Sequence, residues 1–513
     1  NSRALLDDLC MRLGVEPGTP REDGRVSVDA TSCTGMCDQG PALLVNGRVV
    51  TKLDSYRVMN IATLIENRAP LEEWPSEWFR VADNIRRRDI LLSKEPCHGG
   101  ALKELIEKGA DTIFEELEAS GLRGRGGAGF NTALKWKFCR EAGGSGEPND
   151  RVVICNADEG EPGTFKDRVL LNSHTDDVFE GMTVCAGIIG ARQGFLYLRG
   201  EYLYMKPALE ETLAKRRRDG LLGRDILGVS GFDFDIQIHM GAGAYICGEE
   251  SALIESLEGK RGVPRNRPPF PVTHGYLGKP TVVNNVETFL AAAAIAAEGA
   301  DWFTAVGTGE SPGTKLHSIS GDCDRPGIYE FPFGVTIQQM LDECGATDVQ
   351  AVQVAGAAGA TIPADEFHRV LAFEDVSSGG SFMVFHKDRD LLDMVQNFAR
   401  FFVHESCGFC TPCRVGSSLV RDLVDKVHAG QAARYDMEEL LKIGAVMKTA
   451  SHCGLGSTAA NCVLDTLHKL PHIYEKRLAQ ADYEPAFDLD AALQEAREIT
   501  GRDDAGAHIR TDA

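Results

Sequence analysis

Apolar and polar positions follow two alternating periods along the middle of the chain. Short apolar runs at 151–155, 194–198 and 232–240 are typical of buried strands, and the amphipathic pattern over 102–117 predicts a helix. Strands that alternate with helices in this way form parallel sheets. We therefore expect an α/β domain with a parallel sheet over residues 96–300.

Residues 1–68 predict a smaller unit with another order of elements. Leucines with helical spacing occupy 5–13, an apolar stretch at 25–28 predicts a strand, and 42–50 predicts a hairpin that turns at an Asn-Gly pair. Helix, strand, loop, hairpin and helix in this order fit half or more of a thioredoxin-like fold. Residues 69–95, rich in proline, tryptophan and charge, predict a connector.

The pattern changes twice beyond residue 311. Short strands around one helix over 312–390 predict a small domain of the β-grasp type. Helical patterns dominate 391–490 and predict a helical bundle, whereas 491–513 forms a polar tail that we expect to fray. The predicted strands of the β-grasp-like domain are 315–320, 327–331, 352–355 and 382–385, and its predicted helix is 337–343.

Composition and charge narrow the class of protein. The chain has 513 residues, and its 54 basic and 76 acidic side chains give a net charge of −22. Such an acidic chain argues against nucleic acid or an anionic membrane as the main partner. The 15 scattered cysteines are typical of the reducing cytoplasm. The first residues show no signal-peptide pattern, and the apolar run 290–297 is too short to span a bilayer. We therefore expect a cytoplasmic protein without direct membrane contact.

Four cysteines in the helical part form the clearest chemical motif. Cys407, Cys410 and Cys413 are spaced two residues apart, and Cys453 follows farther along. Three thiolates on one loop with a distant fourth are typical of a [4Fe–4S] cluster, which moves one electron at a time. Zinc is the alternative, although its sites usually use two cysteine pairs. Cys462 competes for the fourth position, but the glycines after Cys453 favour Cys453 because a cluster needs close backbone approach.

A glycine-rich segment offers a phosphate site. Gly124, Gly126 and Gly129 match G-x-G-x-x-G, but a predicted helix precedes them, which disfavours a Rossmann fingerprint. Exposed backbone N–H groups can still cradle a phosphate at a helix start. The basic neighbours of this loop are Arg123, Arg125, Lys135 and Lys137. The alternative is a surface loop with solvated basic residues.

Other polar segments follow predicted strands or precede predicted helices. Acidic residues at 158–161 follow a buried strand, where α/β sheets bind ligands. Segment 245–250 places acids in the first turn of a helix, 260–270 is a stiff basic loop that ends in Phe270, and 283–288 offers amides before a helix. Each has a structural alternative: a solvated turn, favourable helix-dipole charges, a core aromatic or an N-cap. Together with a cluster they predict a phosphorylated redox cofactor, which indicates a flavin.

These motifs resemble the NADH-binding flavoprotein subunit of respiratory complex I and its soluble relatives over residues 96–470. The segments that carry the resemblance are 121–130, 156–163, 245–250, 285–288 and 405–414. The resemblance implies hydride exchange between NAD(H) and FMN and single-electron exchange between FMN and a [4Fe–4S] cluster. No catalytic acid or base is needed for the hydride step, which we expect Glu161 and Glu249 to position.

The site residues come from the same resemblance. For FMN they are Gly124, Arg125, Gly126, Gly127, Lys135, Asn156, Asp158, Glu159, Gly248, Asn284, Asn285 and Thr288. For NAD(H) they are Phe130, Phe138 and Phe270, which would stack on the nucleotide, together with Glu161, Tyr245, Glu249 and Glu250. The implied ligands of the [4Fe–4S] cluster are Cys407, Cys410, Cys413 and Cys453.

The N-terminal unit resembles the second half of a thioredoxin-like [2Fe–2S] domain. That family uses two cysteine pairs, whereas only Cys33 and Cys37 match here and Cys10 lies on an apolar helix face. We therefore expect no [2Fe–2S] cluster at Cys33 and Cys37. Such a degenerate fused unit is most similar to the diaphorase (beta) subunit of cytosolic NAD-dependent molybdenum formate dehydrogenase.

That assignment implies two partners: a thioredoxin-like [2Fe–2S] subunit and a larger molybdenum-containing subunit with further iron–sulfur clusters. The alternatives within the family are the flavin subunit of an NAD-reducing hydrogenase and that of complex I. Outside it, a non-enzymatic iron–sulfur relay scaffold and a zinc-binding structural protein remain open.

Overall fold

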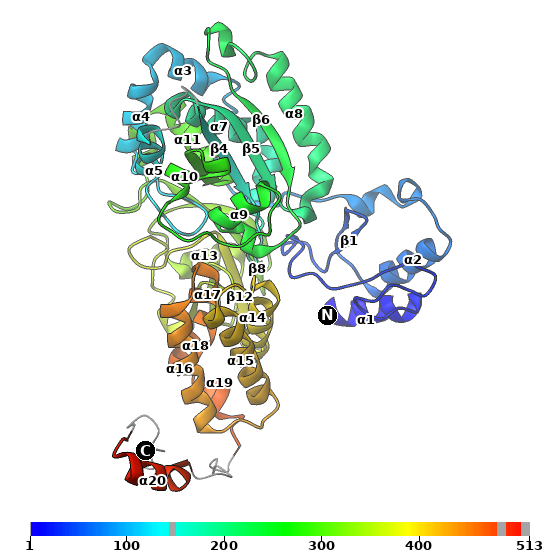
Figure 1. Ribbon diagram of the computed structural model, residues 1–513. Helices are drawn as coiled ribbons and strands as arrows, with labels where there is room; N and C mark the ends of the chain where they lie inside the picture. Colours follow the sequence, from blue (N-terminus) through cyan, green and yellow to red (C-terminus); the bar gives the residue numbers. More distant parts are fainter. Residues whose placement is uncertain (1, 143–149, 480–488, 504–513) are drawn as a thin grey trace.

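The α/β part is built on a four-stranded sheet in which every neighbouring pair is parallel, which confirms the predicted parallel sheet (Figure 1). The computed structural model describes residues 2–142, 150–479 and 489–503. In order across the sheet the strands are β6 (Asp235–Met240), β5 (Ala191–Leu198), β4 (Arg151–Ala157) and β7 (Thr281–Asn285). The sequence pattern indicates only a helix cap in the β7 segment, because its two asparagines interrupt the apolar run.

Helices surround this sheet. They are α3 (Gly100–Lys108), α4 (Ala110–Ala119), α5 (Thr132–Glu141), α6 (Lys166–Ser173), α7 (Thr175–Ile189), α8 (Lys206–Arg218), α9 (Glu250–Leu257), α10 (Pro271–His274), α11 (Val286–Glu298) and α12 (Ala300–Thr304). The single helix predicted over 102–117 is wrong: Gly109, at φ 88°, separates α3 from α4. Helices α7 and α11 pack very closely, since a Cβ at Gly181 would lie 2.0 Å from the carbonyl oxygen of Phe289.

A six-stranded mixed sheet and one helix form the second part. In order across the sheet the strands are β11 (Ala360–Pro363), β10 (Val349–Val354), β12 (Ser381–His386), β8 (Thr314–Gly321), β9 (Gly327–Pro332) and β3 (Ile85–Arg87), with helix α13 (Ile337–Cys344). The edge strand β3 comes from the segment predicted as a connector and pairs in parallel with β9. Two of its three residues are arginines, and they hide such a strand from a hydrophobicity pattern.

The third part is helical and lies below the α/β part in Figure 1. Its helices are α14 (Leu391–Glu405), α15 (Thr411–His428), α16 (Arg434–Ala450), α17 (Gly454–Thr458), α18 (Asn461–Lys469) and α19 (His472–Glu475). A further helix, α20 (Leu489–Thr500), occupies part of the predicted polar tail. None of the helices that the structure describes is both long and apolar enough to cross a membrane.

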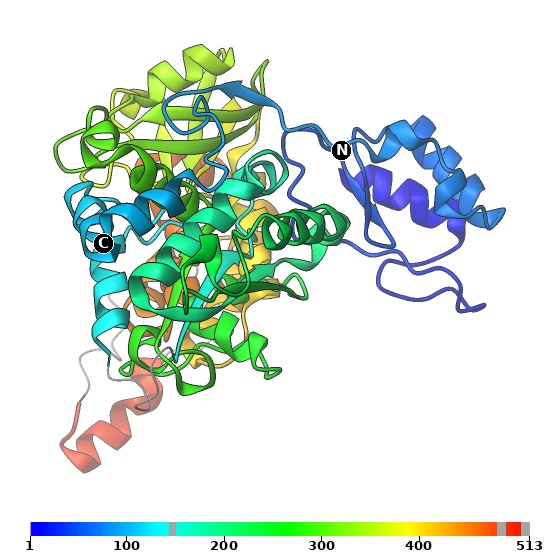
Figure 2. The ribbon, with the colours of Figure 1, turned by 90° about the horizontal axis from the view of Figure 1, so that it is seen from above.

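The N-terminal unit stands to one side of the rest of the chain (Figure 2). It consists of α1 (Ser2–Leu13), the antiparallel hairpin of β1 (Leu43–Val45) and β2 (Arg48–Val50), and α2 (Ser55–Glu66). The strand predicted at 25–28 is wrong, because Val26 and Val28 pair only through turn-like bonds to Arg21 and Gly18. The fold is therefore α/β and multidomain, with a thioredoxin-like unit, a parallel-sheet part and a helical part.

Candidate functional site

A cavity of about 780 Å³ lies beyond the carboxyl ends of β4 and β7. The glycine loop, the acidic loop after β4, the second sheet and helices α17 and α18 all contribute to its wall. Ten of the predicted cofactor residues line this cleft: Gly126, Gly127, Asn156, Asp158, Glu159, Glu161, Tyr245, Gly248, Glu249 and Asn285. Segments that are far apart in the sequence thus meet at one place.

The glycine loop passes close to the strand end that faces it. A Cβ at Gly126 would lie 3.2 Å from the Cβ of Asn285, and Gly127 has φ 123°, a conformation that favours glycine. The loop is closed by a hydrogen bond of 2.8 Å from the Gly124 amide to the Phe130 carbonyl. These glycines let a ligand approach backbone N–H groups directly.

Arg125 and Thr288 support this loop from behind. The Arg125 amide donates to the Thr288 hydroxyl at 2.9 Å. The Arg125 guanidinium is buried against the rings of Phe303 and Phe333, and desolvation lowers its pKa to about 10. Both residues, predicted to contact cofactor, therefore act in this structure on the shape of the loop.

The acidic loop contains carboxylates of two kinds. Glu159 is fully engaged, because it accepts the amides of Asp167 and Arg168 and the Tyr202 hydroxyl. Asp158 is only 9% exposed, and burial raises its pKa to about 8. Among the described residues, Asp158 Oδ2 and Thr164 Oγ1 are buried without a hydrogen-bond partner.

These unpartnered oxygens suit a ligand that brings N–H or O–H donors. A flavin ring and its ribityl chain carry such donors, so the cleft fits FMN. Glu161 forms another wall: it accepts the Tyr245 hydroxyl at 2.5 Å and the Ala358 amide at 3.2 Å. Burial raises the pKa of Glu161 to about 7.

The sequence reasoning missed Lys166, which also lines the cleft. Its ammonium group is buried and contacts Asp167 at 2.7 Å, Asn285 Oδ1 at 2.9 Å and Glu287 at 3.1 Å. Desolvation opposes its charge, but the neighbouring carboxylates outweigh that effect and raise its pKa. The cleft therefore contains a buried ammonium group whose charge Asp167 and Glu287 balance and which holds Asn285 in place.

Three other predicted residues, Lys135, Glu250 and Asn284, join α5, the helix that follows the glycine loop, to its neighbours. Lys135 donates to Glu250 and to the Val283 carbonyl, each at 2.7 Å. The Asn284 side chain accepts the Trp136 indole N–H at 2.9 Å. Their polar atoms thus face protein partners and hold α5 against β7 and α9.

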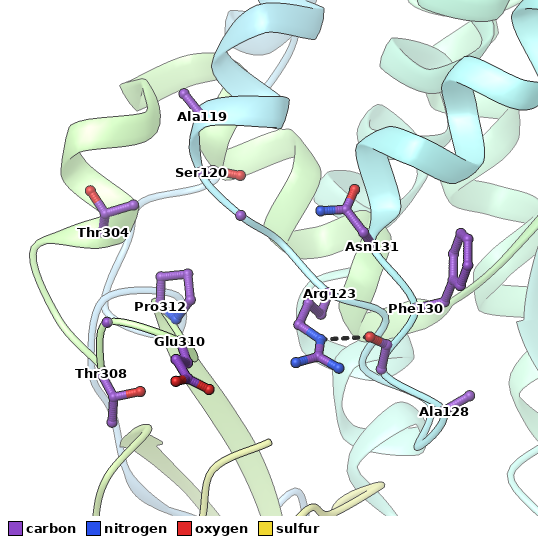
Figure 3. A pocket seen from close by; sticks show the side chains of 13 residues that line it. Ala119, Ser120, Arg123, Ala128, Phe130, Asn131, Thr304, Thr308, Glu310 and Pro312 are labelled. Atoms are coloured by element: carbon purple, nitrogen blue, oxygen red, sulfur yellow. Dashed lines mark hydrogen bonds between the residues drawn. The ribbon is translucent and has the colours of Figure 1, made fainter. Parts of the chain in front are cut away.

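The three predicted stacking phenylalanines are exposed outside the cleft. Phe130, Phe138 and Phe270 are 49%, 44% and 51% exposed, which leaves their rings free to stack on a planar group. A second cavity, of about 680 Å³, lies on another side of the glycine loop, and Phe130 is one of the residues that line it (Figure 3). There Arg123 donates to the Gly129 carbonyl at 2.6 Å and so fixes the loop.

The four predicted cluster ligands line one small cavity. Cys407, Cys410, Cys413 and Cys453 contribute to it, with Ser406 and His452 beside them. The Ser406 hydroxyl lies 3.2 Å from Cys413 Sγ, and the His452 amide donates to Cys410 Sγ at 3.5 Å. Cys462 is buried elsewhere and receives a hydrogen bond from Thr361. The donor set thus fits a cluster held by four thiolates.

The Cys33–Cys37 loop contacts both the α/β part and the helical part. The two sulfurs are 3.9 Å apart, and the contact with Cys37 lowers the pKa of Cys33. The Cys33 carbonyl accepts a hydrogen bond of 2.7 Å from Arg199 Nη2, and the Ser32 hydroxyl donates one to the Glu405 carboxylate. A buried ion pair of 2.9 Å joins Asp38 to Arg168. Two thiols are half of the ligands that a [2Fe–2S] cluster uses, so this pair alone does not complete such a site.

Three protein families match the chain. "Nuo51 FMN-binding domain" matches residues 117–294, "NADH-ubiquinone oxidoreductase-F iron-sulfur binding region" matches 393–477, and "Thioredoxin-like [2Fe-2S] ferredoxin" matches 1–66. The first two confirm the predicted FMN and [4Fe–4S] chemistry and disfavour the zinc alternative. The third conflicts with our expectation that the N-terminal unit has no [2Fe–2S] cluster, an expectation that rests on a count of cysteines.

Individual relatives agree with these families. The chain is 47% identical to the alpha subunit of the NAD-reducing hydrogenase HoxS of Cupriavidus necator, over 96% of this chain and 83% of that protein. It is 40% identical to an NADH-quinone oxidoreductase subunit of Rhizobium meliloti, over 72% and 90%. A crystal structure of an NAD+-reducing [NiFe]-hydrogenase in the H2-reduced state contains a chain that matches with 46% identity and a TM-score of 0.89, over 99% of this chain and 88% of that one.

Proposed function

Because the chain belongs to the family of FMN- and NADH-binding electron-transfer subunits with a [4Fe–4S] region, we propose that it is the diaphorase subunit of an NAD-reducing hydrogenase. The observation that carries this choice is coverage. The hydrogenase subunit matches 96% of the chain, whereas the quinone oxidoreductase subunit matches 72%.

The hydrogenase relatives support this choice over the formate dehydrogenase assignment. That assignment rests on the half-set of Cys33 and Cys37, and a hydrogenase subunit aligns with nearly the whole chain. We accordingly propose hydrogenase subunits, rather than a molybdenum-containing subunit, as the partners of this chain. We place the complex in the cytoplasm, in keeping with the scattered free cysteines.

The cleft residues would bind and orient the reactants. FMN supplies two-electron hydride chemistry with NAD(H) and single-electron chemistry with the cluster. Gly126 and Gly127 would bring backbone N–H groups to its phosphate, and Lys166 would hold Asn285 beside this loop. Asp158 and Thr164 would accept hydrogen bonds from its polar groups, and Arg125, Lys135, Asn284 and Thr288 would hold the surrounding segments in place.

The nucleotide would lie between the cleft and the exposed phenylalanines. Phe130, Phe138 and Phe270 would stack on its planar groups, whereas Glu161, Tyr245 and Glu249 would form the wall beside the reacting rings. Hydride transfer needs contact distance and the exclusion of water rather than an acid or base. The four cysteines would hold the [4Fe–4S] cluster that exchanges single electrons with partner subunits.

Metal analysis of the complex that co-purifies with the chain tests this proposal. We expect nickel, flavin absorbance, and NAD+ reduction that depends on H2. Molybdenum together with formate-dependent NAD+ reduction would instead establish the formate dehydrogenase assignment. A complex without flavin and without NADH:ferricyanide activity would favour the relay scaffold and overturn the enzymatic function itself.

A further inference from the structure

Residues 260–270, here called the strap, connect α9 to α10 and contact the cluster cavity at their beginning. Arg261 Nη2 donates to the carbonyl oxygen of Cys407 at 2.6 Å. Three residues farther on, the Pro264 carbonyl lies 3.2 Å from Nε2 of His452, the neighbour of Cys453. The strap therefore contacts both of the separate segments that provide the cluster cysteines.

The other end of the strap lies at the nucleotide side. Arg267 forms an ion pair of 3.3 Å with Glu249, which lines the cleft and caps α9. Phe270, the last residue of the strap, is 51% exposed. A nucleotide that stacks on Phe270 or approaches Glu249 therefore acts on this end directly.

The middle of the strap is held in place by several contacts. Arg265 donates to Glu258 and to the Gly275 carbonyl, each at 2.8 Å, and also pairs with Glu255. A Cβ at Gly262 would lie 2.6 Å from the sulfur of Cys247, so the strap passes against the segment that carries Tyr245. Pro264, Pro268 and Pro269 each fix one backbone dihedral. The strap is therefore stiff between its two ends.

We propose that the strap couples nucleotide binding to the reduction potential of the [4Fe–4S] cluster, with Arg261 as the positioning residue. The inference rests on the proposed NADH, FMN and cluster chemistry but not on the identity of the partner subunits. A guanidinium held against the cluster loop favours the reduced, more negative cluster. Nucleotide binding displaces the Arg267 end of the stiff strap, brings the Arg261 guanidinium closer to the cluster loop and so raises the potential.

The direction of this effect separates it from simple charge repulsion. A nucleotide carries a negative pyrophosphate, whose field alone would lower the potential of the cluster. Coupling through the strap raises it instead. Coupling is also reciprocal, so the reduced protein must bind the nucleotide more tightly by the same factor.

ADP-ribose is the suitable probe, because it has the adenine and pyrophosphate but no nicotinamide and cannot exchange hydride. We expect two- to threefold tighter ADP-ribose binding when the cluster is reduced, measured by calorimetry on the full chain loaded with FMN and cluster. At about 59 mV per tenfold, this corresponds to a rise of roughly 20–30 mV in an EPR-monitored titration of the cluster.

Three variants locate the coupling. Arg261→Ala should abolish the rise while iron and flavin contents stay normal, and Arg261→Lys, which retains a charge and donors, should restore part of it. Lys260→Ala is the matched control and should leave the rise unchanged. The Lys260 ammonium pairs with Glu255 on α9 and with Glu258 just after it, not with the cluster loop.

Two results would overturn the coupling: a potential that ADP-ribose leaves unchanged or lowers in the wild type, or an equal rise in Arg261→Ala. If Arg261→Ala does not fold, the comparison of wild type with Arg261→Lys decides, since an identical rise in both would also contradict a role for the guanidinium geometry. A preparation without flavin absorbance or without the cluster's EPR signal would contradict the proposed function rather than the strap.

Discussion

Single residues in the cleft serve ligand binding at the expense of stability. Asp158 is the clearest case, because one of its oxygens is buried and finds no partner among the described residues. Its folded-state pKa of about 8 is above the ordinary value of 3.8. A carboxyl group with a raised pKa stabilises the folded state at low pH, and this contribution is lost as the pH rises through about 8.

Asp158→Asn should therefore have opposite effects on binding and stability. We expect FMN affinity to fall roughly 5- to 30-fold, because the amide replaces one carboxyl oxygen with an NH2 group that cannot accept a hydrogen bond, a loss of about 1–2 kcal/mol. The FMN-free variant should melt at a higher temperature than the wild type, with a difference that grows from pH 5 to pH 8. Flavin titration and thermal scans at both pH values measure this. Glu211→Gln, at an exposed position on α8, is the control, and a variant less stable than wild type at pH 8 would contradict the argument.

Glu161 should affect the nucleotide rather than the cluster. Its carboxylate joins the Tyr245 hydroxyl to the Ala358 amide beside the cleft. We expect Glu161→Gln to change the NAD+ dissociation constant roughly three- to tenfold, about 1 kcal/mol, with iron content unchanged. Because its pKa is about 7, wild-type binding should tighten as the pH falls from 8 to 6 and the carboxylate loses its negative charge, whereas the variant should not respond.

Calorimetry at both pH values and iron analysis test this expectation. Tyr245→Phe is the matched comparison, because it removes the hydrogen bond but keeps the carboxylate, and it should retain the pH response. Equal dissociation constants for wild type and Glu161→Gln would contradict a role for Glu161 in nucleotide binding.

The roles of these residues could be predicted from the sequence where their partners lie nearby along the chain. The cysteines at 407–413 could be recognised because three thiols on one loop converge on one place. Lys166 could not, because two of its three partners, Asn285 and Glu287, come from the far end of β7 and the start of α11. Arg125 has the residue type of an anion ligand but is buried among aromatic rings that come from other segments.

At the scale of elements, the sequence pattern predicted three strands of the parallel sheet and missed its fourth strand, β7, and the edge strand β3. Strands β4 and β5 contain apolar runs and β6 alternates apolar with polar residues, whereas β3 is a short charged edge and β7, although buried, ends in two asparagines. The N-terminal unit shows a similar limit. Its elements follow local patterns, but its attachment depends on Asp38, which nothing in the local sequence distinguishes from a surface acid.

Asp38→Ala should release the N-terminal unit. The substitution leaves Arg168 buried without its carboxylate, and breaking such a buried pair costs about 3–5 kcal/mol. We expect faster proteolysis within 69–95 and retained FMN, followed by limited digestion and mass spectrometry. Asp83→Ala, which removes an exposed contact to Asn172, is the control. Unchanged proteolysis of Asp38→Ala would show that the other contacts of the 32–39 loop suffice.

For the whole molecule, the flavin cleft and the cluster are parts of one packed structure. A single buried core contains Ile154 and Phe195 of the parallel sheet together with Phe398, Phe402 and Cys413 of the helical part. Patterns along the chain predict the two parts separately, because their shared core joins residues more than two hundred positions apart. The strap adds a polar contact across the same boundary, and the segment around Cys33 bonds to each of the two parts through Arg199 and Glu405.

Phe402 tests whether the two redox sites unfold together. It is 1% exposed within the shared core and packs near Tyr245 of the cleft, with 6.4 Å between the ring centroids. Phe402→Ala should cost about 3–5 kcal/mol and lower the temperatures of FMN release and cluster loss equally, because one core supports both sites. Flavin fluorescence and cluster absorbance, recorded during the same thermal scan, measure this. Val446→Ala, at a position 56% exposed on α16, should change neither temperature. Cluster loss at a clearly lower temperature than FMN release would show that the helical part unfolds on its own, and the shared core would then not be the structure that holds the two sites at a fixed separation.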